Sequence, residues 1–471
     1  MKKPDRLVGY LKLNDSDCAF EFNDVDFTLS LYPPTQKECD IRSIFEGING
    51  FSHKKHKWIE HLKLSGTTSS GSNIIFSVQD SPSNYNGFKV YDVNWYFCYY
   101  DSMEANSIDG FRIKGPEVDL FYPPQRALET KVNFSEENHK IKSLQVSSND
   151  NNDSSNCGKY RLIKGIDATI ELSAYATIHT DTAVNPIDAN SMMTTCFSKP
   201  VDVDTLIAAY YNAVRFFEYV TYRNNINIES IDIFFYNQDG LRQYDGLLVF
   251  QNKNDIEIHK NVKKRIICYD ILLKKTAKIF TLINKNKIGF GHICKSIDDT
   301  RHYSVSRTIM ILTEFEREYR NIYGTDSNRS EEYVDVKNNI VDLINDYLQG
   351  QHGKRRQYAK QLSRYVNDRD NSFETNVKYA LNDCADIMDI FVKRKYKGNY
   401  KTAVDGIANR IGELRNGIAH SRLDLKFKPI SLADIKIIEE LTYAIRLKKI
   451  GVKNYECKKS INALFGEQFA L

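Results

Sequence analysis

Several features that would place this chain in a common class are missing from its sequence. It has no run of 18 apolar residues, and no apolar signal segment follows its first residues, so we expect neither a membrane span nor secretion. Its nine cysteines are odd in number and never show C-x-x-C spacing, which argues against a disulfide scaffold and a structural zinc site. Walker A and G-x-G-x-x-G loops are also absent, which argues against nucleotide-driven motors and dinucleotide enzymes. We therefore expect a reduced, cytoplasmic protein that needs no cofactor.

Proline is scarce in the second half of the chain. Nine of the ten prolines lie at or before Pro200, and proline breaks helix interiors but is tolerated in turns, so this distribution predicts strands first and helices after. Apolar and polar residues alternate over 25–31 and 166–179, as in the half-buried strands of an antiparallel sheet. Aromatic-rich runs at 95–100 and 118–122 are predicted to be further strands.

Helical spacing first appears near residue 201. Asp202 or Asp204 can cap a helix there, because an aspartate side chain accepts hydrogen bonds from the first backbone N–H groups of a helix. The segments 231–236 and 247–250 then look like strands again, and 266–282 fits either a helix or a strand.

From Ser304 onward the apolar residues recur only at helical spacing. Four amphipathic stripes are expected at 305–322, 336–348, 377–391 and 404–418. One more helix is expected after Pro429, with Ser431 and Asp434 as its capping box.

These patterns predict an α+β protein of two parts. Residues 1–298 are expected to form a β-rich region with antiparallel sheets and an internal break near residue 200, and residues 299–471 an all-α bundle. Residues 301–471 carry 30 Lys and Arg against 23 Asp and Glu, a net +7, whereas the rest of the chain has 35 against 38, a net −3. The helical part is therefore the expected polyanion-binding part.

The most informative segment is Arg415-Asn416-Gly417-Ile418-Ala419-His420, at the end of the fourth stripe. Arginine stays charged and binds phosphate through a bidentate fork, while histidine exchanges protons near neutral pH. Residues five apart on an ideal helix lie about 140° from each other, so Arg415 and His420 share a face only through the length of arginine or a looser turn at Gly417. Asn416 and His420 are direct neighbours. The alternative is an exposed helix end where His420 interacts with the helix dipole.

The segment resembles the R-x(4-6)-H motif of HEPN domains, in which a polar residue follows the arginine, here Asn416. A large β-rich region before a helical bundle, and the opening segment Leu7-Val8-Gly9-Tyr10-Leu11, also resemble the ApeA-like proteins of bacterial antiphage defence. The resemblance implies a metal-independent endoribonuclease that acts in abortive infection. It would cut cellular RNA, with tRNA as a plausible substrate, to 2',3'-cyclic phosphate and 5'-hydroxyl ends, with Arg415, Asn416 and His420 as catalytic residues. A phage-derived trigger, sensed by the N-terminal region, is implied as well.

One motif supplies a single histidine, whereas in-line phosphoryl transfer works best with an acid and a base on opposite sides. A homodimer through the C-terminal bundle, or a higher oligomer containing it, would bring two motifs together. Basic residues that could guide RNA to them are Lys354, Arg355, Arg356, Lys393, Arg394, Lys395, Lys397, Lys401 and Arg422. Each basic cluster could equally be a solvated helix end, and the alternative function is a non-catalytic HEPN module that dimerises or binds RNA.

Two other groups have some of the residue types of a functional site. His53, His56 and His61 have spacings that could ligate a metal, but nearby lysines oppose a bound cation. His292 with Cys294 resembles a catalytic Cys/His pair only superficially. We expect no metal site.

Overall fold

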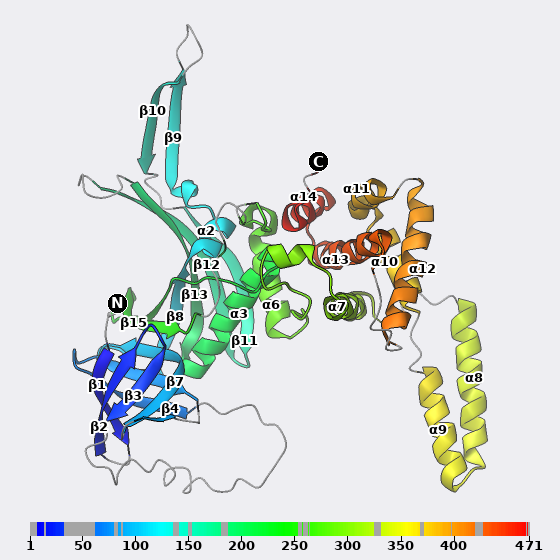
Figure 1. The fold of residues 1–471 in the computed structure, drawn as a ribbon, viewed down its shortest axis with the longest axis horizontal. Helices are drawn as coiled ribbons and strands as arrows, with labels where there is room; N and C mark the ends of the chain where they lie inside the picture. The colour runs from blue at the N-terminus through cyan, green and yellow to red at the C-terminus, as the bar shows by residue number, and fades with distance from the viewer. Residues whose placement is uncertain are drawn as a thin grey trace. The chain divides into compact units, whose positions relative to one another are not determined.

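The structure is a computed structural model. The residues that it describes are 7–13, 16–32, 62–79, 83–85, 88–134, 141–148, 153–179, 187–252, 257, 262, 264–324, 331–367, 372–396, 398–419, 427–467 and 469. They fall into two compact units, Met1–Phe217 with Asn225–His259 and Glu218–Asn224 with Lys260–Leu471 (Figure 1). The first is built mainly of antiparallel strands and the second of helices, so the predicted α+β class is confirmed.

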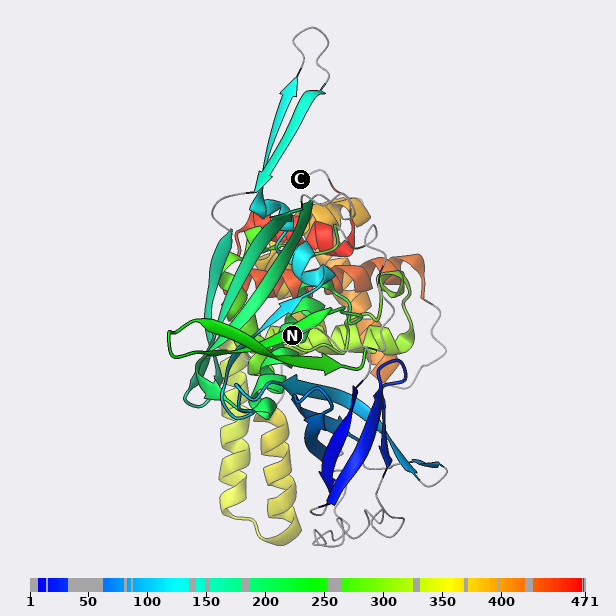
Figure 2. The ribbon, with the colours of Figure 1, turned by 90° about the vertical axis from the view of Figure 1, so that its left-hand side faces the viewer.

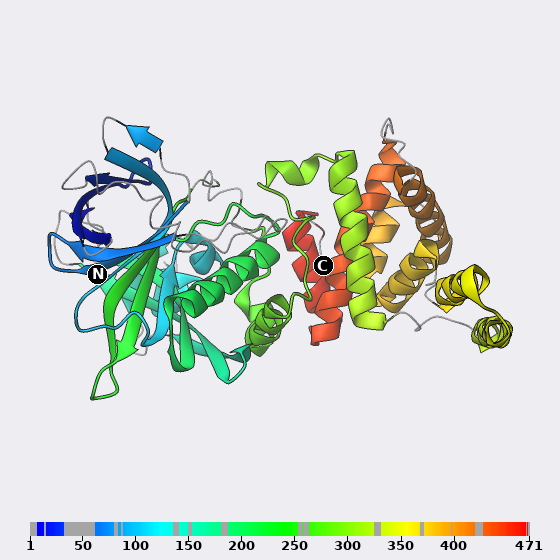
Figure 3. The same ribbon diagram turned by 90° about the horizontal axis from the view of Figure 1, so that it is seen from below.

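The first unit begins with a closed β-barrel. Strand β7 (Phe88–Tyr99) closes it, because β7 pairs with both β3 and β5, and Figure 3 shows the resulting ring. Aromatic rings fill the interior, where Phe22 lies 5.5 Å from Phe76 and 5.1 Å from Tyr96 between ring centroids. The remaining barrel strands are β1 (Leu7–Leu13), β2 (Ser16–Asn23), β3 (Thr28–Tyr32), β4 (Leu62–Thr68) and β5 (Asn73–Val78), and the short β6 (Ser83–Tyr85) pairs with β7.

A twisted antiparallel sheet continues from the barrel through the pairing of β15 with β7 (Figure 2). The predicted strand at 166–179 is confirmed as β12, whose even-numbered residues Ala168, Ile170 and Leu172 are buried. The sheet order is β11-β12-β13-β8-β14-β15-β7. Its strands are β8 (Ile108–Lys114), β11 (Ser154–Ile163), β12 (Ile166–Ile178), β13 (Ile187–Val201), β14 (Ser230–Tyr236) and β15 (Arg242–Phe250), while β9 (Leu128–Phe134) and β10 (Ile141–Ser148) form a separate ribbon.

Two strand predictions in this unit need correction. The run 118–122 lies not in a strand but mostly in helix α2 (Pro116–Phe121), followed by the 3-10 turn η2 (Pro124–Ala127). Gly115 has a φ of 154°, and Pro116 occupies the first helical position, where its fixed φ favours a helix start. The strand expected from residue 25 begins only at Thr28, because the Asn23 side chain accepts a hydrogen bond from the Val25 N–H at 2.9 Å and forms a turn.

Helix α3 (Val203–Thr221) begins where the sequence indicated. Asp202 is its cap, since its carboxylate accepts a hydrogen bond from the Thr205 N–H at 2.8 Å. Asp204 instead forms an ion pair with Lys63 at 2.5 Å.

The longer secondary-structure elements described in the second unit are helices. The segment 266–282, for which the sequence left helix and strand open, is helical from Tyr269 onward. The Ile267 N–H donates to the Val220 carbonyl at 2.9 Å, and both residues belong to the second unit. This unit therefore begins before the expected boundary at residue 298. The helices are α5 (Tyr269–Leu272), η3 (Leu273–Lys275), α6 (Thr276–Asn284), η4 (Asp298–Arg301), α7 (Val305–Tyr323), α8 (Glu331–Gln349), α9 (Gly353–Asn367), α10 (Phe373–Asp383), α11 (Ala385–Lys395), α12 (Tyr400–Ala419), α13 (Pro429–Ile450) and α14 (Asn454–Phe465).

Some helix boundaries differ from those expected. The third stripe, 377–391, is divided between α10 and α11, which meet at Cys384, and the sequence pattern did not reveal α9 or α14 as separate helices. The proposed capping box of Ser431 and Asp434 is wrong: α13 begins at Pro429, and its cap residue is Lys428, three residues before Ser431.

Helix α13 is buried on nearly all sides, and its charged side chains are paired with other helices. Asp434 accepts two hydrogen bonds from Arg410 of α12, at 2.7 and 2.8 Å. Glu440 pairs with Lys395 of α11 at 2.7 Å, and Arg446 pairs with Glu318 of α7. Because a buried charge without a partner is costly, these pairs fix which helices surround α13.

Candidate functional site

The candidate site lies at the C-terminal end of α12. Val404, Ile407 and Ile411 of this helix are buried in the bundle, and Arg410 is fixed by its bidentate contact with Asp434. The next turn carries Arg415. Apolar burial and one strong ion pair therefore hold the helix that presents the predicted catalytic arginine.

Arg415 lies against two side chains that the sequence motif did not predict. Its Nη2 is 3.5 Å from Glu316 Oε2 on α7, and its guanidinium lies 5.9 Å from the ring centroid of Phe373. The Arg415 side chain remains 42% exposed, so solvent screens the ion pair, which is worth at most about 1 kcal/mol. The guanidinium can therefore exchange this contact for a phosphate.

A cavity of about 250 Å³ opens at this point between α7 and α12. Apolar side chains form most of its wall, and Arg415 and Glu316 are its charged residues. The full set that lines it is Ile309, Leu312, Thr313, Glu316, Arg415 and Ile418. A mostly apolar cavity with one cation is suited to an unstacked base or ribose whose phosphate reaches the arginine.

The remaining residues of the motif are placed as follows. Asn416 is exposed and does not line the cavity. Helix α12 continues through Gly417 as regular α-helix, and a Cβ there would meet nothing within 4 Å, so the structure shows neither a loosened turn nor a close approach that needs glycine. His420 and Arg422 lie outside the described residues, as does the histidine-containing run from His53 to His61, where no metal site was expected.

The two basic clusters differ in how much of their charge is available. Lys354, Arg355 and Arg356 are all exposed at the start of α9. Lys395, in contrast, is only 14% exposed and pairs with Glu440 and with Glu467 at 3.5 Å, so its charge is offset inside the protein.

The two residues before Lys395 also contact other side chains of the protein. Lys393 pairs with Asp389 at 3.3 Å, and the Arg394 guanidinium lies 4.5 Å from the ring centroid of Phe469. Lys401 is exposed at the start of α12, and Lys397 is outside the described residues. Among the described residues of the two clusters, none contributes to the wall of the Arg415 cavity.

His292 and Cys294 are buried, in keeping with a bystander role. Burial, and secondarily Arg307, lowers the pKa of His292 to about 3, so its ring is neutral at physiological pH. Burial raises the pKa of the Cys294 thiol to about 12. A neutral imidazole beside a protonated, inaccessible thiol does not make a nucleophilic pair.

Comparison with protein-family models, curated proteins and solved structures finds no match for this chain. Within the described ranges, no helix is long and apolar enough to cross a membrane. Over the same residues, no three or more His, Cys, Asp and Glu side chains converge as a metal site.

Sequence reasoning missed Glu316 and Phe373 as neighbours of Arg415. Glu316 lies within the predicted stripe of α7 and Phe373 precedes the predicted stripe of α10, but a stripe shows which face of a helix is buried and not which helix covers it. The pairing of α7 with α12 depends on the ion pairs around α13, which no local pattern reveals.

Proposed function

We propose that the helical unit is a HEPN-type, metal-independent endoribonuclease with Arg415 and His420 as its catalytic pair. The observation that carries this proposal is the position of Arg415. Its partly exposed guanidinium lines an open, mostly apolar cavity at the end of α12, five residues before His420 in the chain. A cation beside a cavity that suits a base or ribose can offset the negative charge that builds on the phosphoryl oxygens when RNA is cleaved without a metal ion.

The chemistry assigns one task to each residue. His420 takes the proton of a ribose 2'-hydroxyl, whose oxygen attacks the adjacent phosphorus while the bond from phosphorus to the 5'-oxygen breaks. Arg415 offsets the negative charge that accumulates on the phosphoryl oxygens. The leaving 5'-oxygen takes a proton from an acid on the opposite side, and His420 of a second copy in a homodimer can supply it. The products are a 2',3'-cyclic phosphate and a 5'-hydroxyl. Asn416 is included in this site as a polar neighbour of His420.

The biological role that we propose is antiphage defence by abortive infection. The nuclease would be held inactive by the β-rich region until a phage-derived trigger appears, and would then cut cellular RNA. As its substrate we propose structured RNA with an exposed loop, such as tRNA, because unstacked nucleotides can reach in-line geometry.

Single substitutions test the catalytic assignment. We expect His420→Ala and Arg415→Ala each to lower the RNA cleavage rate of the purified protein by about 10²-fold or more. Glu413→Gln is the matched control, because Glu413 is an exposed charged residue of α12 that does not line the cavity. If either alanine variant cuts RNA at the wild-type rate, the assignment is wrong.

A second candidate function is a non-catalytic module that dimerises or binds RNA. The contacts of Arg415 with Glu316 and Phe373 favour it, since a purely structural arginine would make contacts of the same kind. Under this alternative the wild-type protein does not cut RNA, and Arg415→Ala lowers the melting temperature without changing any activity.

A further inference from the structure

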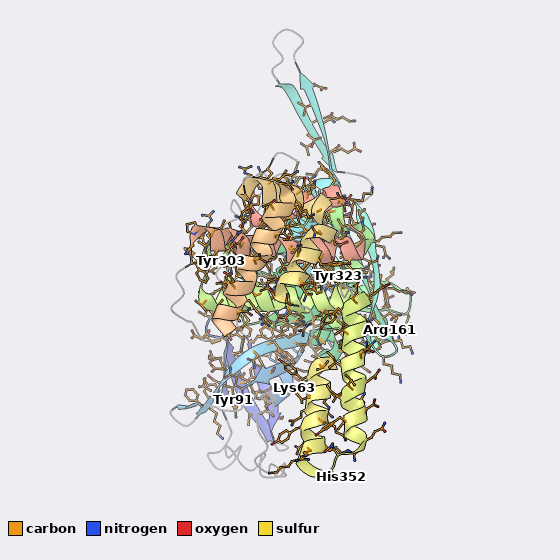
Figure 4. The ribbon with its side chains drawn as sticks, turned by 90° about the vertical axis from the view of Figure 1, so that its right-hand side faces the viewer. Lys63, Tyr91, Arg161, Tyr303, Tyr323 and His352 are labelled. Carbon is orange, nitrogen blue, oxygen red and sulfur yellow. The ribbon has the colours of Figure 1, made fainter. Side chains whose placement is uncertain are left out.

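Helices α8 and α9 form an antiparallel hairpin whose exposed surface is unusually apolar. Figure 4 shows the two helices side by side with His352 at the turn between them. Their contact with each other uses a limited set of side chains: Ala359 and Ser363 of α9 are buried, whereas no described side chain of α8 is buried. A second apolar stripe is left exposed on each helix.

The exposed stripe of α8 follows a regular heptad-like spacing. Val336, Ile340, Leu343 and Tyr347 are separated by four, three and four residues, so they lie along one face. The half-buried positions Val341 and Ile344 lie between this stripe and α9. The stripe is therefore additional to the face that packs within the hairpin.

Helix α9 carries a matching stripe of Tyr358, Leu362 and Tyr365, spaced by four and three residues. The two stripes border the same groove, which has a volume of about 400 Å³ and is lined by Ile340 and Leu343 from α8 and by Tyr358 and Leu362 from α9, among others. One continuous apolar face thus runs along the hairpin.

We propose that this face, the α8–α9 face, is a self-association surface whose occupant is the α8–α9 face of a second copy of the chain. The seven side chains of the two stripes are each between 42% and 70% exposed. With about 200 Å² of surface for each large apolar side chain, they offer on the order of 800 Å², which is about what each partner contributes to a stable interface. Two hairpins packed in this way make an antiparallel four-helix bundle.

The charges beside the stripes indicate how the two copies are arranged. Helix α8 has five acidic residues and one lysine, whereas α9 has five basic residues and no acidic one. By helical spacing, Asp335 and Asp346 border the α8 stripe on the side away from α9, and Lys354 and Arg364 border the α9 stripe on the side away from α8.

A two-fold axis parallel to the hairpin satisfies these charges. It places α8 of one copy opposite α9 of the other, with both turns at the same end, so that Asp346 faces the partner's Lys354 and Asp335 faces the partner's Arg364. The other face-to-face arrangement, with the turns at opposite ends, would place α8 against α8 and bring like charges together. The charge pattern therefore selects the first arrangement.

The apolar part of the proposal is tested by sedimentation of the full-length protein without RNA, so that its outcome does not depend on the proposed nuclease activity. We expect Leu343→Glu to raise the dissociation constant for two copies that associate through the α8–α9 face about tenfold or more, because a carboxylate replaces an apolar contact at the centre of the face. Asn338→Glu introduces the same charge on the opposite side of α8 and should leave association unchanged. If Leu343→Glu leaves the mass of the largest species unchanged, the α8–α9 face is not the interface.

Two charge-reversed variants provide a second test, in which association is expected to be regained and not only lost. One variant carries Asp335→Lys and Asp346→Lys, and the other carries Lys354→Glu and Arg364→Glu. Each should associate weakly alone, and an equimolar mixture of the two should recover the association of the wild-type protein. Failure of the mixture to recover it would overturn the proposal. So would a monomeric wild-type protein whose RNA binding is lost in the second variant, since the face would then be an RNA contact.

Discussion

Arg415 is held by a weak contact in the structure, and this has a consequence for its proposed role. Glu316, which pairs with it, is partly exposed and lies in the wall of the same cavity. A phosphate bound there would meet both the attraction of the guanidinium and the repulsion of this carboxylate.

We therefore expect Glu316→Gln to raise the RNA cleavage rate at limiting substrate by up to about fivefold, the equivalent of ~1 kcal/mol for a partly exposed pair. The double variant Glu316→Gln with Arg415→Ala should still cut RNA far more slowly than the wild-type protein, because removing the carboxylate does not replace the lost guanidinium. A cleavage assay below saturation measures both. A lower rate for Glu316→Gln would mean instead that Glu316 positions Arg415.

A second residue-scale prediction concerns the pH dependence of stability. Burial raises the pKa of Glu440 from 4.5 to about 8, and the nearby Lys395 only partly opposes the shift. Because the folded state holds this proton more tightly than the unfolded state, Glu440 stabilises the fold fully below pH ~4.5, and that stabilisation is lost as pH rises to about 8.

Replacing Glu440 with Gln removes this titration. The melting temperature of Glu440→Gln relative to wild type should therefore rise between pH 5 and pH 8, as measured by calorimetry at both pH values. Glu413→Gln, at an exposed position of α12, serves as the control and should show no such change. A constant difference between Glu440→Gln and wild type across this range would contradict the account.

At the scale of elements, the start of a helix could be predicted where one side chain accepts the capping hydrogen bond. Asp202 was one of two predicted caps of α3, and the structure confirms it. The sequence predicted only that helical spacing begins near Ser304; in the structure the Ser304 hydroxyl accepts a hydrogen bond from the Arg307 N–H at 3.1 Å and caps α7. The break between α10 and α11 at Cys384 was not predictable, because apolar residues continue at helical spacing across it.

The cap of α3 supports a direct stability prediction. Asp202→Ala should cost about 1 kcal/mol of unfolding free energy, since the Thr205 N–H loses its acceptor. Asp202→Asn keeps an acceptor in place and should recover most of the loss. Denaturant unfolding of the full chain measures both, and equal stability of Asp202→Ala and wild type would show that the cap contributes nothing.

At the scale of the whole molecule, the sequence predicted the class of each part better than the contacts within them. Proline distribution and periodicity were sufficient to predict strands followed by helices, because both are local properties of the chain. The closure of the barrel by β7, the assignment of α5 and α6 to the helical unit, and the contact of Glu316 with Arg415 depend on long-range pairing. The position of Arg415 at the end of α12 was predictable, whereas the cavity beside it was not.

The chemistry of the RNA ends tests the central claim most directly. Purified wild-type protein is incubated with RNA in excess EDTA, in parallel with His420→Ala, and the ends of any fragments are identified by mass spectrometry. The proposed mechanism predicts that the wild-type protein cuts RNA without metal and leaves 2',3'-cyclic phosphate and 5'-hydroxyl ends, and that His420→Ala does not. Cleavage that EDTA abolishes, or fragments with 5'-phosphate ends, would contradict it.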